Sequence, residues 1–171
     1  CRVRRPPRST LFPYPTLFRS LRGAQWHLKN PPDGVEDLLD AGVGLYWVSP
    51  VMPMLGKEPL KVQSIVEPIF TAHGFDMVVS FILLTERAIV AIFNIAFDKS
   101  VPEDCKAASD CYETTLKALM DQGYYIYRSG LQGMPAIKNR SSVFWDVATD
   151  IKRALDPKDI IARGRYIDPL K

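Results

Sequence analysis

The chain has 171 residues, of which 47% are hydrophobic and 24% are charged; this length suits one globular core and leaves too little chain for two full domains. The formal net charge is +3, but residues 1–22 hold six arginines and no acid. The remaining residues, 23–171, have 16 basic and 19 acidic side chains, a net charge of −3. The charge therefore gives no case for nucleic-acid binding, and no apolar run is long enough to span a membrane.

The first segment of the chain differs from the rest. Residues 9–20 have no usable periodicity and resemble a translated short-read sequencing adapter, from which only Pro15 departs. We therefore expect residues 1–21 to be an artefact or a disordered arm, and we exclude them from the fold. An arginine-rich arm for nucleic acid is the functional alternative. No signal peptide is expected.

Strand and helix patterns alternate in the body. The first is a strand-like run over residues 43–48 that ends at Ser49-Pro50. Residues 60–73 place apolar side chains at i, i+3, i+4, i+7 and i+8, which predicts a helix ending at Gly74. Residues 76–84 and 87–97 are β-rich runs separated by a short turn, which predicts a hairpin.

The second half of the body repeats this alternation. Ser100-Val-Pro-Glu103 has the pattern of a capping box before a helix that ends at Gly123, and residues 124–128 form a short strand candidate. The order strand, helix, strand, strand, helix, strand predicts an α+β, ferredoxin-like antiparallel sheet with helices on one face. A further helix is expected over residues 142–155, followed by a tail.

The cysteines and histidines indicate whether disulfides or a metal site are expected. The three cysteines are Cys1, Cys105 and Cys111, and the last two lie six residues apart on one predicted helix. That spacing rotates them by about 240°, so they cannot pair within the helix. A reducing compartment is therefore expected, hence a cytoplasmic protein, with the periplasm as the alternative. His27 and His73 have no ligand neighbours at useful spacing, so no metal site is predicted.

Two stretches carry candidate chemistry. In the first, an aromatic run ends at Tyr127-Arg128, where a phenol and a guanidinium at a strand end suit an anionic ring oxygen. Packing aromatics with one surface arginine are the alternative. In the second, a turn beginning at Asp156-Pro157 leads to Gly164-Arg165, and a helix end followed by a solvated tail is the simpler interpretation.

Four blocks together resemble a known family. They are Gly44–Pro50, Tyr127-Arg128, Ile151–Pro157 and Ile160–Arg165, and they resemble the C-terminal half of flavoproteins of the vanillyl-alcohol oxidase/4-cresol dehydrogenase type. The resemblance implies that residues 22–140 form a cap domain over the isoalloxazine ring of FAD. It also implies that residues 141–171 return to an FAD-binding domain that is missing from this piece.

The resemblance also implies roles for individual residues. Tyr127 and Arg128 would bind the phenolate of a para-substituted phenol as catalytic residues, and Arg128 would also lie near the flavin. Hydride would pass from the benzylic carbon of the substrate to FAD, which performs the chemistry that the protein positions and polarises. Arg165 would lie near the cofactor. Tyr46 is a candidate for tyrosyl attachment of FAD, with non-covalent FAD as the alternative.

Departures from the family pattern leave the substrate open. Ile89 and Val90 stand where the family has a histidine pair, and Arg163 stands where it has a proline. One alternative is an FAD-linked 2-hydroxy-acid dehydrogenase; another, of a different class, is a non-enzymatic ferredoxin-like interaction module. The implied partners are a small phenol, the missing FAD-binding domain and either a second copy of the protein or a cytochrome electron acceptor. The piece alone is expected to be inactive and to bind FAD weakly or not at all.

Overall fold

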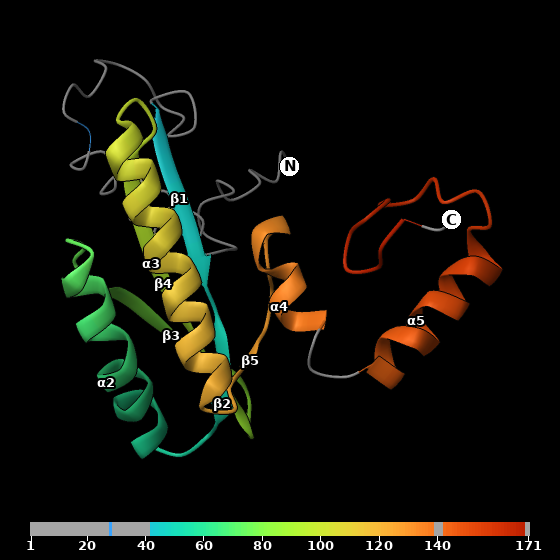
Figure 1. Cartoon of the computed structure of the whole chain (residues 1–171). Coiled ribbons are helices and arrows are strands. Elements are labelled where there is room, and N and C mark those ends of the chain that lie inside the picture. Colours follow the sequence, from blue (N-terminus) through green and yellow to red (C-terminus); the bar gives the residue numbers. More distant parts are fainter. Residues whose placement is uncertain (1–27, 29–41, 139–141, 170–171) are drawn as a thin grey trace, which may run out of the picture.

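An antiparallel sheet with two long helices on one face forms the main body of the protein (Figure 1). The computed structural model describes residue 28 and residues 42–138 and 142–169. The strands are β1 (Val43–Val48), β2 (Pro50–Pro53), β3 (Val78–Thr85), β4 (Ala88–Asp98) and β5 (Tyr125–Ile126). The helices are α2 (Lys57–Ala72), α3 (Pro102–Asp121), the short 3₁₀ turn η3 (Leu131–Gly133), α4 (Met134–Lys138) and α5 (Ser142–Leu155).

Strand β4 is the centre of the sheet. It pairs with β3 along one edge and with β1 and then β2 along the other, and β2 pairs in turn with β5; every pairing is antiparallel. If β1 and β2 are taken as one strand interrupted at Ser49, the order across the sheet is β5, β1/β2, β4, β3. This is the ferredoxin-like order, so the predicted α+β fold class is confirmed.

The core lies between the sheet and helices α2 and α3. Alternate residues of β4 enter it, because strand side chains alternate between faces. The helices contribute one stripe each, as their 3.6-residue period requires. The members from these elements are Ile89, Ala91, Phe93, Ile95 and Phe97 of β4; Val62, Val66 and Phe70 of α2; and Ala108, Cys111, Tyr112, Leu116, Leu119 and Met120 of α3.

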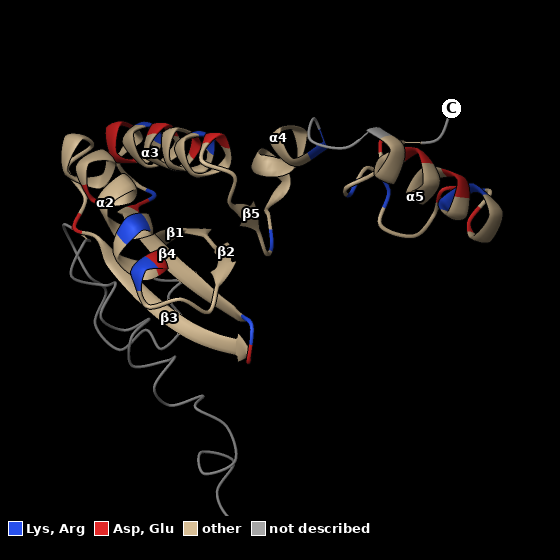
Figure 2. Cartoon of the chain, turned by 90° about the horizontal axis from the view of Figure 1, so that it is seen from below, with Lys and Arg blue, Asp and Glu red and all other residues tan. Residues whose placement is uncertain are grey.

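The sheet face opposite the helices is largely apolar. In Figure 2 the ribbon is blue or red mainly along the helices and at the β3–β4 turn, where the charged residues lie, while the strands are largely tan. Trp47 of β1 is 48% exposed, and Val78 and Ile82 of β3 are 51% and 43% exposed. The described part of the chain contains no helix long and apolar enough to cross a membrane.

The predicted capping box of α3 is wrong. The helix begins at Pro102 with Val101 as its N-cap, and no side chain caps it. The hydroxyl of Ser100 instead donates to the Asp98 carboxylate at 2.6 Å, and the Ser100 N–H donates to the same oxygen at 2.8 Å. Because Ser100 is engaged by a residue that precedes it, its hydroxyl is not used for capping the helix.

Other boundaries agree with the sequence to within a few residues. Helix α2 begins at Lys57, earlier than expected, and continues through Pro68. Gly74 and Gly123 follow the two long helices with φ of +78° and +89°, the left-handed geometry that favours glycine at these positions. Helix α5 has the predicted bounds. The adapter-like segment lies outside the described residues, and the domain boundaries at 21/22 and 140/141 stay predictions.

Candidate functional site

The Tyr127-Arg128 pair follows β5 at the edge of the sheet. Along this segment the side chains alternate: Tyr124 is buried, Tyr125 is exposed, Ile126 packs on the core and Tyr127 is 62% exposed. The Tyr127 N–H donates to the carbonyl of Ser49 at 2.8 Å, at the junction of β1 and β2. The sheet therefore holds the Tyr127 backbone, while the side chains of Tyr127 and Arg128 stay exposed.

A buried polar cluster lies directly after this pair. Ser129 is only 2% exposed, and its hydroxyl lies 3.4 Å from the hydroxyl of Tyr112 on α3 and donates to the Gly130 carbonyl at 2.9 Å. Burial raises the pKa of Tyr112, so this hydroxyl stays protonated at neutral pH. A Cβ at Gly133 would lie 2.3 Å from the Ser129 hydroxyl oxygen, so the backbone of η3 closes tightly over the cluster.

The C-terminal tail reaches the same cluster through Tyr166. The Ser129 N–H donates to the Tyr166 hydroxyl at 3.3 Å, and that hydroxyl donates to the Ser129 carbonyl at 3.4 Å. The neighbouring Arg165 is exposed, with its guanidinium carbon 5.7 Å from the centre of the Tyr166 ring. The structure thus brings the segments that carry Arg128 and Arg165 together, although they lie far apart in the sequence.

A carboxylate-centred turn shapes the tail before Arg165. The Asp156 carboxylate accepts from the Ile160 and Ile161 N–H groups at 3.0 and 2.8 Å and from the Lys152 ammonium at 2.7 Å. Lys152 also pairs with Asp159 at 2.9 Å. The bond from Lys152, followed by the two backbone bonds, lowers the pKa of Asp156 to about 2. The Ile160–Arg165 block is therefore a defined turn attached to the end of α5.

Acid should open this turn in a narrow pH window. Because the folded pKa of Asp156 is depressed to about 2 from 3.8, its contribution to stability is present above pH 3.8 and is lost as the pH falls through 2. We expect the NMR amide shifts of Ile160 and Ile161 to titrate with a midpoint near 2. In Asp156→Asn the titration should disappear; an unchanged titration there would assign it to another group.

Tyr46 lies on the helix side of the sheet. Its ring centre is 5.2 Å from that of Phe97 and 5.4 Å from that of Tyr112, and it packs against the core. This placement gives Tyr46 a packing role beneath α3. A link between its hydroxyl and FAD stays a prediction.

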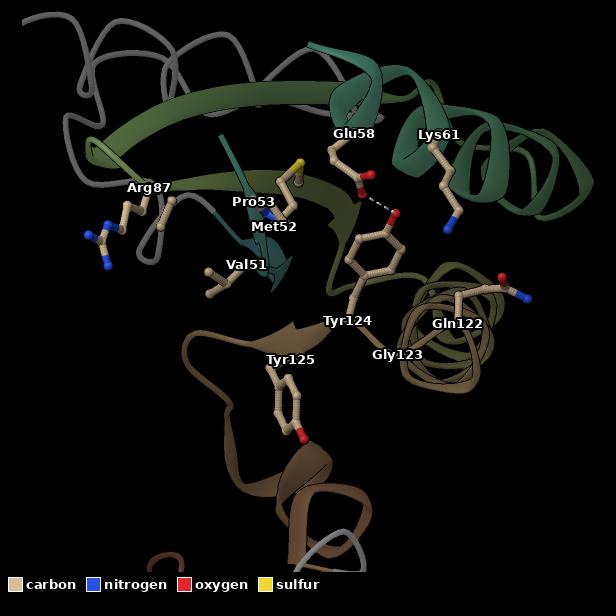
Figure 3. Close-up of a pocket in the computed structure, with 11 residues that line it drawn as sticks. Val51, Met52, Pro53, Glu58, Lys61, Arg87, Gln122, Gly123, Tyr124 and Tyr125 are labelled. Carbon is tan, nitrogen blue, oxygen red and sulfur yellow. Dashed lines mark hydrogen bonds between the residues drawn. The ribbon is translucent and has the colours of Figure 1, made fainter. Parts of the chain in front are cut away.

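A pocket of about 460 Å³ opens beside β2 and the end of α3 (Figure 3). The Tyr124 hydroxyl donates to Glu58 at 2.9 Å within it, and the Lys61 ammonium lies 5.4 Å from the centre of the Tyr124 ring. Burial, then the bond to Glu58, raises the pKa of Tyr124 to about 12. Its lining includes Tyr125, but not Tyr127, Arg128, Arg165 or Tyr46, so the pocket is distinct from the predicted site.

The sequence did not indicate the residues that support the pair. Tyr112 lies within the predicted helix that ends at Gly123 and was not a candidate site residue, and Ser129 and Tyr166 carried no signal beyond their position beside an arginine. Their partnership joins positions 37 residues apart, and only the fold brings them together. Within the described residues, no group of three or more histidine, cysteine or acidic side chains could hold a metal ion.

No family model matches the chain. Over 150 residues it is 35% identical to 1'-carboxy-chondrochloren decarboxylase of Chondromyces crocatus, an alignment that covers 88% of this chain and 28% of that protein. Over 125 residues it is 29% identical to the 4-cresol dehydrogenase (hydroxylating) flavoprotein subunit of Pseudomonas putida, covering 72% of this chain and 24% of that protein.

The fold has a solved counterpart. A structure of 4-ethylphenol oxidase from Gulosibacter chungangensis in complex with isoeugenol superposes with a TM-score of 0.70 at 24% identity, over 77% of this chain and 26% of that one. The chain spans about a quarter of the length of each of these proteins. It therefore belongs to the vanillyl-alcohol oxidase/4-cresol dehydrogenase type of proteins and corresponds to a piece of them with an antiparallel sheet and helices.

Proposed function

We propose that this chain is the cap domain and C-terminal tail of a flavin-dependent oxidoreductase that oxidises a para-substituted phenol. The observation that carries the proposal is the placement of Tyr127 and Arg128: adjacent, with exposed side chains, on a backbone fixed by Ser49 and Tyr166. The names of two related proteins, a 4-cresol dehydrogenase flavoprotein subunit and a 4-ethylphenol oxidase, support the substrate class.

The two side chains suit a phenolate. The Tyr127 hydroxyl donates one hydrogen bond and the Arg128 guanidinium donates several, with a permanent positive charge that favours the deprotonated ring oxygen. Holding the oxygen at one point orients the para substituent toward the cofactor. Stabilising negative charge where it develops is the contribution expected of such groups.

Two exposed arginines support a flavin ring near the Tyr127-Arg128 pair. Arg128 and Arg165 lie on segments that meet where Tyr166 bonds to Ser129, and their positive charges suit a reduced flavin that carries negative charge. No glycine-rich phosphate loop is present in the sequence. When bound, FAD supplies the hydride acceptor, and the preceding domain of the intact protein would hold its pyrophosphate.

The test uses the intact flavoprotein that carries this chain. We expect 4-ethylphenol to change the absorbance spectrum of its flavin on binding and to be oxidised, whereas 2-hydroxy acids should not be oxidised. In Tyr127→Phe, which loses one hydrogen bond to the phenolate, the Kd for 4-ethylphenol should rise about five- to tenfold. Turnover of 2-hydroxy acids with no response to phenols would replace the proposal with the hydroxy-acid dehydrogenase alternative.

A second candidate activity is a decarboxylation. It is favoured by one observation, that the relative with 35% identity is named a decarboxylase. The two activities are separated by their products, since a decarboxylase releases CO₂ from a carboxylated substrate and a 4-alkylphenol has no carboxyl group to lose. Release of labelled CO₂ from a carboxylated phenol, without oxidation of 4-ethylphenol, would select this candidate.

The proposal also covers a partner and a location. The Pseudomonas putida relative is named as a flavoprotein subunit, which supports a cytochrome partner or a second copy of the protein. The cytoplasmic location is proposed from the cysteine usage alone, because Cys105 and Cys111 cannot pair within their helix. Co-purification of the intact protein with a haem-containing subunit would support the cytochrome.

A further inference from the structure

The segment that carries Tyr127 and Arg128 is fixed on both sides. On one side, the Tyr127 N–H donates to Ser49 of the sheet at 2.8 Å. On the other, both backbone groups of Ser129 bond to the Tyr166 hydroxyl, at 3.3 and 3.4 Å. Arg128 is the residue between these two attachments, so its Cα position depends on the sheet and on the tail together.

Tyr166 is itself held in place by its surroundings. Its ring stacks on Trp145 of α5, with centres 6.2 Å apart and planes within 4° of parallel. Its N–H lies 3.2 Å from the sulfur of Met134 on α4. Tyr166 adopts a φ of +60°, which a non-glycine residue rarely adopts without support from its surroundings.

Tyr112 of α3 and Gly133 of η3 pack closely against the Ser129 side chain and leave it little space to move. The hydroxyls of Ser129 and Tyr112 are 3.4 Å apart, and a Cβ at Gly133 would lie 2.4 Å from the Tyr112 oxygen. Ser129 is therefore enclosed by α3, by η3 and by the tail. Of these three, only the tail forms hydrogen bonds with both the N–H and the carbonyl of Ser129.

We propose that Tyr166 is a positioning residue for the Tyr127-Arg128 pair: its hydroxyl holds the backbone that follows the pair, and thereby sets the affinity for the phenolate. This inference rests on the proposed function. It assigns the C-terminal tail a role in substrate binding, beyond that of carrying Arg165 to the cofactor. The tail acts through Ser129 and does not itself touch the substrate.

Two measurements test the proposal, with Tyr166→Phe as the variant. This change removes the hydroxyl and keeps the ring that stacks on Trp145. In this chain, amide hydrogen exchange at Ser129 should quicken about fivefold, the effect of one ordinary hydrogen bond. In the intact flavoprotein, the Kd for 4-ethylphenol, measured from the flavin absorbance, should rise about fivefold with little change in Tm.

Asp168→Asn is the matched control, because it removes the exposed ion pair of Asp168 with Lys138 in the same tail and leaves the Tyr166 hydroxyl in place. Asp168 is 89% exposed in that pair, so exchange at Ser129 and the Kd should stay at wild-type values. Wild-type exchange at Ser129 in Tyr166→Phe, or a wild-type Kd for 4-ethylphenol, would overturn the positioning role alone. A wild-type flavoprotein whose spectrum does not respond to 4-ethylphenol would overturn the proposed function and, with it, the substrate role of Tyr166.

Discussion

Gly44→Ala is expected to destabilise the chain by about 1–3 kcal/mol, the usual cost of forcing an extra group into a filled core. Gly44 lies in β1 opposite Phe97 of β4. A Cβ at this position would lie 2.2, 2.3 and 2.7 Å from three carbons of the Phe97 ring. That ring cannot move freely, because it also packs against Tyr46, with ring centres 5.2 Å apart, and belongs to the buried core.

Urea unfolding followed by circular dichroism measures this loss directly. Gly56→Ala is the matched control, since no atom lies within 4 Å of a Cβ built there, and its stability should stay within about 0.5 kcal/mol of wild type. Phe97→Leu combined with Gly44→Ala should recover part of the loss, because the smaller side chain frees space. Equal stability of the two alanine variants would show that the Phe97 ring does not fill the space beside Gly44.

Gly44 illustrates the difference between a local and a distant cause. Its strand is predicted by nearby residues, whereas the need for a glycine comes from a contact with another strand. The sequence predicted the strand from its β-branched and aromatic residues, and the structure places that strand as expected. The ring that requires a glycine comes from β4, which lies about fifty residues later in the chain. A contact between distant segments leaves no local pattern, so only the pairing of β1 with β4 explains the glycine.

Local patterns were sufficient where an element is long and buried on one side. Helices α3 and α5 and the β3–β4 hairpin lie where the sequence predicted them, although the capping box of α3 does not form. They were insufficient for β2, where Pro50 and Pro53 argue against a strand, yet Pro50 pairs with Ile126 of the two-residue strand β5 and Val51 with its Tyr125. The short η3 and α4 have too few residues for a periodic signal.

The candidate site also contains some residues that the sequence indicated and others that only the fold reveals. Tyr127, Arg128 and Arg165 were selected because aromatic and cationic residues suit an anionic oxygen, and because their blocks resemble a family. The residues that hold them, Ser129 and Tyr166, have no distinctive chemistry by themselves. Their role arises from a hydroxyl placed between two backbone groups, which no one-dimensional pattern records.

Arg128→Ala in the intact flavoprotein is expected to lower kcat/KM for 4-ethylphenol by about 10²–10³-fold, the range found when one group that stabilises developing charge is removed. Two features of the structure support an effect of this size. The side chain is exposed, so its removal leaves no buried cavity, and the attachments at Tyr127 and Ser129 keep the backbone in place. The variant should therefore lose catalytic efficiency without losing stability, so its Tm should be unchanged.

Two further variants serve as comparisons. One separates the charge of Arg128 from its donor geometry, and the other removes an exposed arginine outside the candidate site. Arg128→Lys keeps the positive charge and loses the planar fork of donors, so it should fall between wild type and alanine. Arg153→Ala removes an exposed arginine of α5 whose guanidinium pairs with the exposed Asp150 at 3.2 Å, and its kcat/KM should match wild type. Steady-state kinetics at several substrate concentrations then show where Arg128 acts: a fall in kcat indicates contact with the reacting system, whereas a rise in KM alone would restrict Arg128 to substrate binding and contradict its catalytic role.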